Sequence, residues 1–223
     1  MTALAADVIQ KPGGHTSWYK VVSVTTKYGT HSIGRRAAEN ALHAIRYAGL
    51  TGRPINTHVT ISFIALGVHD DEAGAIFRRL QVSLSRWWRY QRKDKGRGIG
   101  APVGVYGHAN PAGSRHVHWL LHLPEDIHED FVAAAKKRLG KIAGLHDIGD
   151  ALHVQQVIQV GGVAKYILRG IEPAYAEYLH IRAADEGTVA CRRTGTTRII
   201  GKTARKLAGW NRKRNTVETT AAA

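Results

Sequence analysis

Residues 101–123, APVGVYGHANPAGSRHVHWLLHL, contain two apolar runs separated by a short polar turn. The runs 101–109 and 116–123 are rich in Val, Leu, Tyr and Trp, which favour extended strands. Between them Asn110, Pro111 and Gly113 are typical of a tight turn. The stretch therefore predicts a β-hairpin, because two strands joined by so short a turn pair in antiparallel fashion.

A strand and a long helix are expected on each side of this hairpin. Upstream, 56–66 (NTHVTISFIAL) alternates as a half-buried strand does, and the helix expected over 70–93 begins with acidic and ends with basic residues. Downstream, a helix over 125–143 and a strand over 153–160 follow. This order is that of a split βαβ sandwich. We therefore predict an α+β fold with a central antiparallel β-sheet and helices packed on one face. Along 56–66 the apolar face holds Val59, Ile61 and Phe63, and the polar face holds His58, Thr60 and Ser62.

The segment before this unit predicts a separate N-terminal extension. A strand is expected over Trp18–Thr26 (WYKVVSVTT) and a helix over Ser32–Tyr47. Gly49, Gly52 and Pro54 then make the clearest break in the chain. We expect a strand–helix extension in 1–54 and the main domain in 55–182.

The last segment, 183–223, predicts a basic tail. Between Cys191 and Arg214 it is rich in Lys and Arg and contains no Asp or Glu. Such a segment favours a helix or arm that binds DNA phosphates, with Arg192 and Arg193 as candidate contacts.

Composition limits the class of partner. The chain of 223 residues has 32 Lys and Arg against 17 Asp and Glu, a formal net charge of +15. This excess indicates a polyanion such as nucleic acid. The single cysteine excludes an intramolecular disulfide framework and a CxxC zinc site. Neither a signal peptide nor a transmembrane segment is expected, so we predict a cytoplasmic protein that does not insert into membranes.

His116 and His118 are candidate metal ligands. Side chains at i and i+2 of a strand leave the same face, so both imidazoles can reach one ion. His122 shares that face, and His108 on the neighbouring hairpin strand is a candidate third ligand. Imidazoles with open coordination positions suit a divalent ion that polarises a phosphate. The alternative is that these histidines only form local hydrogen bonds on a basic surface.

Tyr166 is the candidate nucleophile. In GGVAKYILRG (161–170) the apolar residues form one helical stripe, and Tyr166 lies well outside it. Lys165 and Arg169 beside it supply positive charge that can bind a phosphate. A metal that neutralises a phosphodiester oxygen and a nearby hydroxyl are the minimum equipment for transesterification of a nucleic-acid backbone. The alternative is a surface tyrosine that packs by its ring edge.

The strands THVTISF and HVHWLLHL, followed by the helix VAKYILRG, resemble the three motifs of HUH-type endonucleases. The single tyrosine after the histidine pair resembles the rolling-circle replication initiator (Rep) proteins of plasmids and phages. The resemblance implies Mg²⁺ or Mn²⁺ held by His116 and His118, and single-stranded DNA or an origin hairpin as substrate. It also implies that Tyr166 nicks the strand and keeps the 5′ phosphate as a phosphotyrosyl ester. A host helicase and polymerase would be partners, because the chain has no helicase segment.

Other functions stay open on the sequence. The turn into the histidine pair also resembles conjugative relaxases, whose nucleophile precedes the histidines, and Tyr47 would then be the candidate. A transposase of the same nuclease class and a non-catalytic basic nucleic-acid-binding module are further alternatives. The run Trp87-Trp88-Arg89-Tyr90 is consistent either with base stacking or with tryptophans packed on the sheet.

Overall fold

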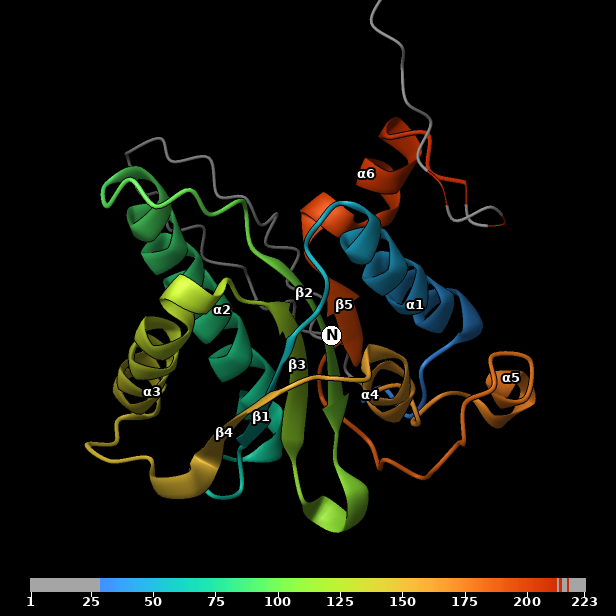
Figure 1. Ribbon diagram of the computed structural model, residues 1–223. Helices are drawn as coiled ribbons and strands as arrows, with labels where there is room; N and C mark the ends of the chain where they lie inside the picture. The colour runs from blue at the N-terminus through green and yellow to red at the C-terminus, as the bar shows by residue number, and fades with distance from the viewer. Residues whose placement is uncertain (1–28, 212, 214–215, 217–223) are drawn as a thin grey trace, which may run out of the picture.

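The computed structural model describes residues 29–211, 213 and 216, and a five-stranded antiparallel sheet lies at its centre (Figure 1). Its strands are β1 (Thr57–Ser62), β2 (Val103–Ala109), β3 (His116–His122), β4 (Leu152–Gln156) and β5 (Thr194–Thr196), in the order β4-β1-β3-β2-β5. The predicted α+β class with a central antiparallel sheet is confirmed. The strand expected over Trp18–Thr26 lies outside the described residues.

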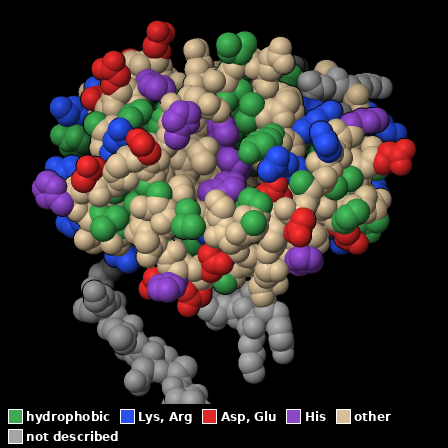
Figure 2. Space-filling model, turned by 90° about the horizontal axis from the view of Figure 1, so that it is seen from below, with side chains coloured by type: hydrophobic (Ala, Val, Ile, Leu, Met, Phe, Trp, Pro, Cys, Tyr) green, Lys and Arg blue, Asp and Glu red, His purple; other side chains and the backbone are tan. Residues whose placement is uncertain are grey.

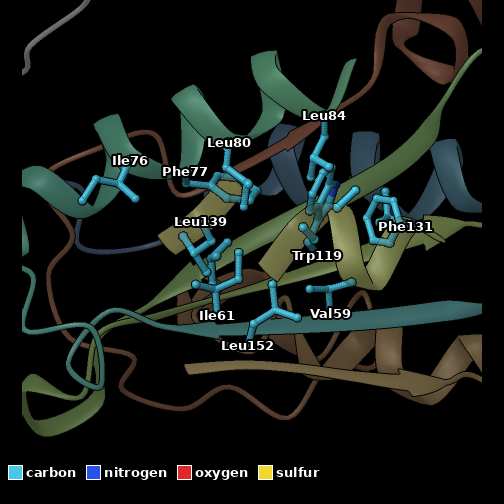
Figure 3. Packing of buried hydrophobic residues seen from close by; sticks show 14 of the residues in the cluster. Val59, Ile61, Ile76, Phe77, Leu80, Leu84, Trp119, Phe131, Leu139 and Leu152 are labelled. Atoms are coloured by element: carbon cyan, nitrogen blue, oxygen red, sulfur yellow. The ribbon is translucent and has the colours of Figure 1, made fainter. Parts of the chain in front are cut away.

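Two long helices cover one face of this sheet. They are α2 (Asp70–Lys93), which has the predicted bounds, and α3 (His128–Ala143), which follows a short 3-10 turn at Glu125–Ile127. Figure 3 shows how Phe77 and Leu80 of α2 and Phe131 of α3 meet Val59, Ile61 and Trp119 of the sheet. Alternation in the strands produces this layer, because every second side chain points to the same face. In the described part of the chain, no helix is both long and apolar enough to cross a membrane.

Helices also lie on the opposite face, which the prediction of helices on one face did not include. Figure 1 shows α1 (Arg35–Leu50), α4 (Val160–Tyr166) and α6 (Lys202–Leu207) on the side of the sheet away from α2 and α3. A short helix, α5 (Pro173–Ala176), follows α4. The second hydrophobic cluster is built from the sheet residues Val103, Val105 and Leu120 and from residues of α1, α4 and α5. The sheet is therefore the middle layer of three.

The predicted segments 1–54, 55–182 and 183–223 do not form separate cores. The second cluster takes Ala41 from the first segment, Leu168 from the second and Ile200 from the third. Strand β5 of the expected tail pairs with β2, and the buried Arg205 donates from Nη2 to Oδ1 of Asn40 in α1 at 2.7 Å. The break at Gly52 is only a turn with φ of 70°. The described parts of all three segments share one fold.

The two adjacent tryptophans of α2 belong to the core. Trp87 packs edge-on against Trp88 and Phe131, with ring centroids 6.2 and 6.0 Å apart. Nε1 of Trp88 donates to the carbonyl oxygen of Gly100 at 2.8 Å. Both side chains are buried, so neither offers a face for base stacking.

Candidate active site

His116 and His118 lie side by side on the face of β3 that carries α4. They alternate with Val117 and Trp119, which point into the layer under α2 and α3. The centroids of the two imidazole rings are 4.6 Å apart. In Figure 2 histidine side chains gather near the middle of the surface, with Lys or Arg side chains on one side. The spacing of the motif therefore brings the two rings together, as predicted.

Each ring of the pair has one nitrogen occupied by the protein. Nδ1 of His116 donates to the carbonyl oxygen of Ser114 at 2.7 Å, because a carbonyl can only accept. Nδ1 of His118 lies 3.0 Å from Nε2 of His58. Hydrogen bonds at Nδ1 leave Nε2 as the nitrogen available to a metal, and such bonds usually fix the ring of a metal-ligating histidine.

His58 is the residue of this site that the sequence did not assign. It lies on β1, the neighbour of β3, and its Nδ1 is 2.9 Å from the side-chain amide of Gln155 on β4. Thr60 adds a hydroxyl 3.2 Å from Nδ1 of His118. The polar face of the 56–66 pattern contained His58 and Thr60, but only the pairing of β1 with β3 shows that they meet His118. They form a hydrogen-bonded support behind the histidine pair, in which His58 is buried and Thr60 is half-buried.

Burial keeps His118 neutral. The pKa of His118 is lowered to about 3, first by loss of solvation and then by the positive charges of His116, His58 and Arg169. The pKa of His58 is lowered in the same direction, by burial and by His153. At neutral pH both imidazoles therefore keep an unprotonated nitrogen, as a metal ligand must.

Tyr166 lies over His118. The ring centroids are 5.1 Å apart, and the rings meet edge to face with an interplanar angle of 67°. The tyrosine is 41% exposed, so the phenol is open to a substrate. Its helix, α4, is held on the sheet by Ala164, Ile167 and Leu168, which are buried in the second cluster. A tyrosine predicted off the apolar stripe therefore stands beside the predicted metal ligands.

A glycine allows this close approach. Gly107 of β2 is the register partner of His118 on β3. A Cβ atom at position 107 would lie 2.4 Å from the carbonyl oxygen of Ile167, the residue after Tyr166. Backbone therefore packs on backbone here, and only glycine leaves the space.

Positive charge surrounds the phenol. The guanidinium carbon of Arg169 is 4.5 Å from the centroid of the Tyr166 ring, within the range of a cation–π contact. Arg169 also forms a salt bridge with the buried carboxylate of Glu186. Lys165 is exposed on the same helix. Lys165 and Arg169, both predicted as DNA contacts, are thus next to the candidate nucleophile.

His108 does not join the histidine pair. In the hairpin register Gly107, and not His108, lies opposite His118, so the His108 side chain points to the other face. There its ring packs edge-on against Phe77, with centroids 5.2 Å apart. The prediction of His108 as third metal ligand is therefore wrong. His122 is also occupied, because its Nδ1 donates to the carbonyl oxygen of Pro54 at 2.7 Å.

The location of His108 makes a prediction for stability. Its pKa is lowered to about 3, by burial first and then by Arg115 and Arg193. Below pH 6.5 this histidine becomes protonated in the unfolded chain but stays neutral in the folded one, so stability falls as pH falls. His108→Phe keeps a ring in this aromatic site and removes the proton. Between pH 7 and 4.5 the wild type should lose about 2–3 kcal/mol more unfolding free energy than the variant, measured by urea denaturation. Parallel pH dependences would contradict the assigned burial.

Of the two arginines predicted as DNA contacts in the tail, only Arg192 is exposed. Arg193 is 2% exposed and donates to the backbone carbonyl oxygens of His108, Glu186 and Thr30, at 3.0 to 3.3 Å. Its predicted role as a DNA contact is therefore wrong, and it ties β5 to the hairpin. Arg192 lies beside α2 instead, where it and Arg78 line the same cavity.

Tyr47, the alternative nucleophile, is buried. It is 7% exposed and packs edge-on against Trp210, with ring centroids 6.3 Å apart. Both residues belong to the apolar layer around α1. Its hydroxyl is not presented to a substrate, which removes the structural basis for the relaxase-like order.

The donors of the site fit a divalent cation. His116 and His118 offer two imidazole nitrogens from one strand, each with its second nitrogen hydrogen-bonded. Among the described residues no group of three or more His, Cys, Asp and Glu side chains has the arrangement of a metal site. Two protein nitrogens suit an open site in which substrate oxygens and water supply the other ligands.

The chain matches no protein-family model, and no curated protein matches it.

Proposed function

We propose that this protein is an HUH-type endonuclease that nicks and rejoins single-stranded DNA and thereby initiates rolling-circle replication of a plasmid or phage. The observation that supports it most is the contact between the 41% exposed side chain of Tyr166 and His118 of β3. A hydroxyl nucleophile beside two hydrogen-bonded imidazoles is the equipment that transesterification of a phosphodiester requires. Single-stranded DNA, or the hairpin of an origin, is the proposed substrate.

In the proposed reaction the phenolic oxygen of Tyr166 attacks the phosphorus of the scissile phosphodiester. The bond between this oxygen and phosphorus forms as the bond from phosphorus to the 3′ oxygen breaks. The phenolic proton passes to solvent, which the partly exposed side chain permits, and the departing 3′ oxygen takes a proton from water. The DNA 5′ phosphate stays on Tyr166, and attack by a 3′ hydroxyl reverses the step and joins the strand.

The surrounding residues hold the reacting groups. Arg169 is positioned to pair with the phosphate while its stacking fixes the tyrosine ring, and Glu186 orients Arg169. Mg²⁺ or Mn²⁺, held at Nε2 of His116 and His118, would supply the positive charge that neutralises a non-bridging phosphate oxygen. With the metal at Nε2, His118 would carry its proton on Nδ1 and donate it to Nε2 of His58. His58 would then carry its own proton on Nδ1, which faces the side-chain amide of Gln155, and the oxygen of that amide would accept it.

The polarity of the covalent product tests this proposal. A random-sequence pool of single-stranded 40-mers, labelled at the 3′ end, is incubated with the protein and Mn²⁺ and separated under denaturing conditions. We expect the label on the protein, because the fragment with the 5′ phosphate is the one retained. A pool labelled at the 5′ end should give only free shortened DNA, and EDTA should prevent both. Binding without any covalent product would favour the non-catalytic basic module.

Gly107→Ala should separate the tyrosine from the histidines. The added Cβ would collide with backbone at Ile167, so α4 must move away from β2. A displacement of about 1 Å can reduce a rate by about 100-fold, and we expect a loss of that order in the rate of adduct formation. Gly162→Ala is the matched control, because a Cβ at position 162 of the same helix meets nothing within 4 Å. Equal rates for the two variants would show that the close packing at Gly107 does not position Tyr166.

A further inference from the structure

The outer face of α2 carries a stripe of positive charge. Six exposed basic side chains form it: Arg78, Arg79, Arg86, Arg89, Arg92 and Lys93. Between Ala73 and Lys93 the helix has no Asp or Glu, and its acidic residues are confined to the first turn. We call these six residues the α2 stripe.

Helix geometry makes the stripe continuous. At 100° per residue its six members fall within an arc of about 140°, and from Arg78 to Lys93 the axis rises about 22 Å. The opposite arc holds Phe77, Leu80, Leu84 and Trp88, which pack on the sheet. Figure 3 shows Ile76, Phe77, Leu80 and Leu84 turned from α2 toward the strands. The same period that buries one face therefore directs the basic residues outward.

These charges are not neutralised within the described protein. None of the six forms an ion pair with a described carboxylate, whereas Arg97, just beyond the helix, pairs with Asp130 at 2.8 Å. Arg192 extends the positive surface beside Arg78, since both line a cavity of about 190 Å³ between α2 and the sheet. A row of unpaired guanidinium groups on a rigid helix complements a row of phosphates.

The aromatic residues of α2 distinguish a duplex from a single strand. Proteins that hold single strands stack bases on exposed aromatic rings. Trp87 and Trp88 are turned into the core, and Tyr90 is the exposed aromatic residue of the helix. The surface thus offers charge for a backbone and little for unpaired bases. Duplex DNA fits this surface better than a single strand does, because its bases are paired and its phosphates are what a row of charges can contact.

We infer that the α2 stripe, together with Arg192, binds the phosphate backbone of duplex DNA. The stripe lies on the helix layer of the sheet opposite to α4, so this surface is separate from the Tyr166 site (Figure 1). The inference goes beyond the proposed nicking function, since it concerns a second surface and a different form of DNA. Binding there would depend on charge and not on sequence.

Binding of a labelled 20-base-pair duplex of arbitrary sequence, in EDTA so that no cleavage interferes, tests the inference. The test variant combines Arg86→Gln, Arg89→Gln and Lys93→Gln. The control combines Lys136→Gln, Lys137→Gln and Lys141→Gln, which removes equal charge from exposed positions on the neighbouring α3. At 100 mM salt we expect the test variant to bind about tenfold more weakly or worse, and the slope of log K against log salt to fall by about 2–3. The control should change less than twofold.

Three results would overturn the inference. Equal weakening in both variants would mean that only net charge matters. Greater weakening with the single strand of the same sequence would identify a single-stranded occupant. Loss of binding to anionic phospholipid vesicles with unchanged duplex binding would identify a membrane surface. Tyr166→Phe should bind the duplex like the wild type. The duplex-binding result can therefore be interpreted even if the protein does not nick DNA.

Discussion

Tyr166→Phe should abolish covalent attachment of DNA to the protein. Phenylalanine keeps the ring against His118 and under Arg169, so the packing of α4 is retained, but no oxygen remains to attack phosphorus. Loss of a covalent nucleophile commonly reduces rates by about 10⁴-fold or more, which places the adduct below detection on a denaturing gel. Non-covalent binding of the same oligonucleotide should change little.

Tyr178→Phe provides the matched control. Tyr178 is 63% exposed and also has an arginine over its ring, with the guanidinium carbon of Arg35 4.6 Å from the centroid. It thus shares the exposure and the cation–π contact of Tyr166 but has no histidine pair beside it. Wild-type amounts of adduct are expected from this variant. An adduct retained by Tyr166→Phe would show that another residue is the nucleophile.

His118→Ala and His116→Ala should each weaken Mn²⁺ binding by about 100-fold or more, because each removes a nitrogen ligand. Loss of a residue that only supports a ligand already lowers metal affinity by about 10–100-fold. Calorimetric titration of the DNA-free protein measures this directly. Adduct formation should fall in parallel.

His108→Phe distinguishes the two faces of the sheet in that titration. Since His108 points into the layer under α2, the variant should bind Mn²⁺ with wild-type affinity. A loss of affinity as large as that of His118→Ala would mean that His108 reaches the metal and that the hairpin register differs from the one described.

The error over His108 shows where the sequence stops being informative. Both hairpin strands were predicted, and so was the common face of His116 and His118, because alternation within a strand is fixed. The relation between strands depends on how many residues the turn contains, and one residue more or less reverses the face. Here Ala109 pairs with His116, and a short helical turn, Pro111–Gly113, lies within the connection.

The second helix layer could not be predicted, because its buried residues are mainly small or charged. Buried positions of α1 are mainly alanines, Ala38, Ala41, Ala44 and Ala48, whose weak apolar signal did not indicate a core helix. Strand β5 consists of Thr194–Thr196 within a basic segment, and Arg193 beside it is buried by bonds to backbone oxygens. Charged residues are rarely buried unless hydrogen bonds satisfy them, and no local sequence pattern predicts which backbone oxygens will accept those bonds.

The contact between His58 and His118 could not be predicted for a related reason. The position of His58 on the polar face of its strand was predicted, but its function depends on which strand lies next to β1. Pairing with β3 on one side and β4 on the other brings His118 and Gln155 to it. The placement of Tyr166 outside the apolar stripe, in contrast, could be predicted from its own helix, because its angle away from that stripe is a local property.

In the proposed reaction Tyr166 becomes covalently bonded to a DNA 5′ phosphate. Mass spectrometry of the protease-digested adduct, formed with the 3′-labelled pool and Mn²⁺, tests it most directly. We predict that the nucleotide remnant is found on the peptide containing Tyr166, through a phosphodiester to the phenolic oxygen. A remnant on Tyr47, on a serine or on any other residue would contradict the assignment.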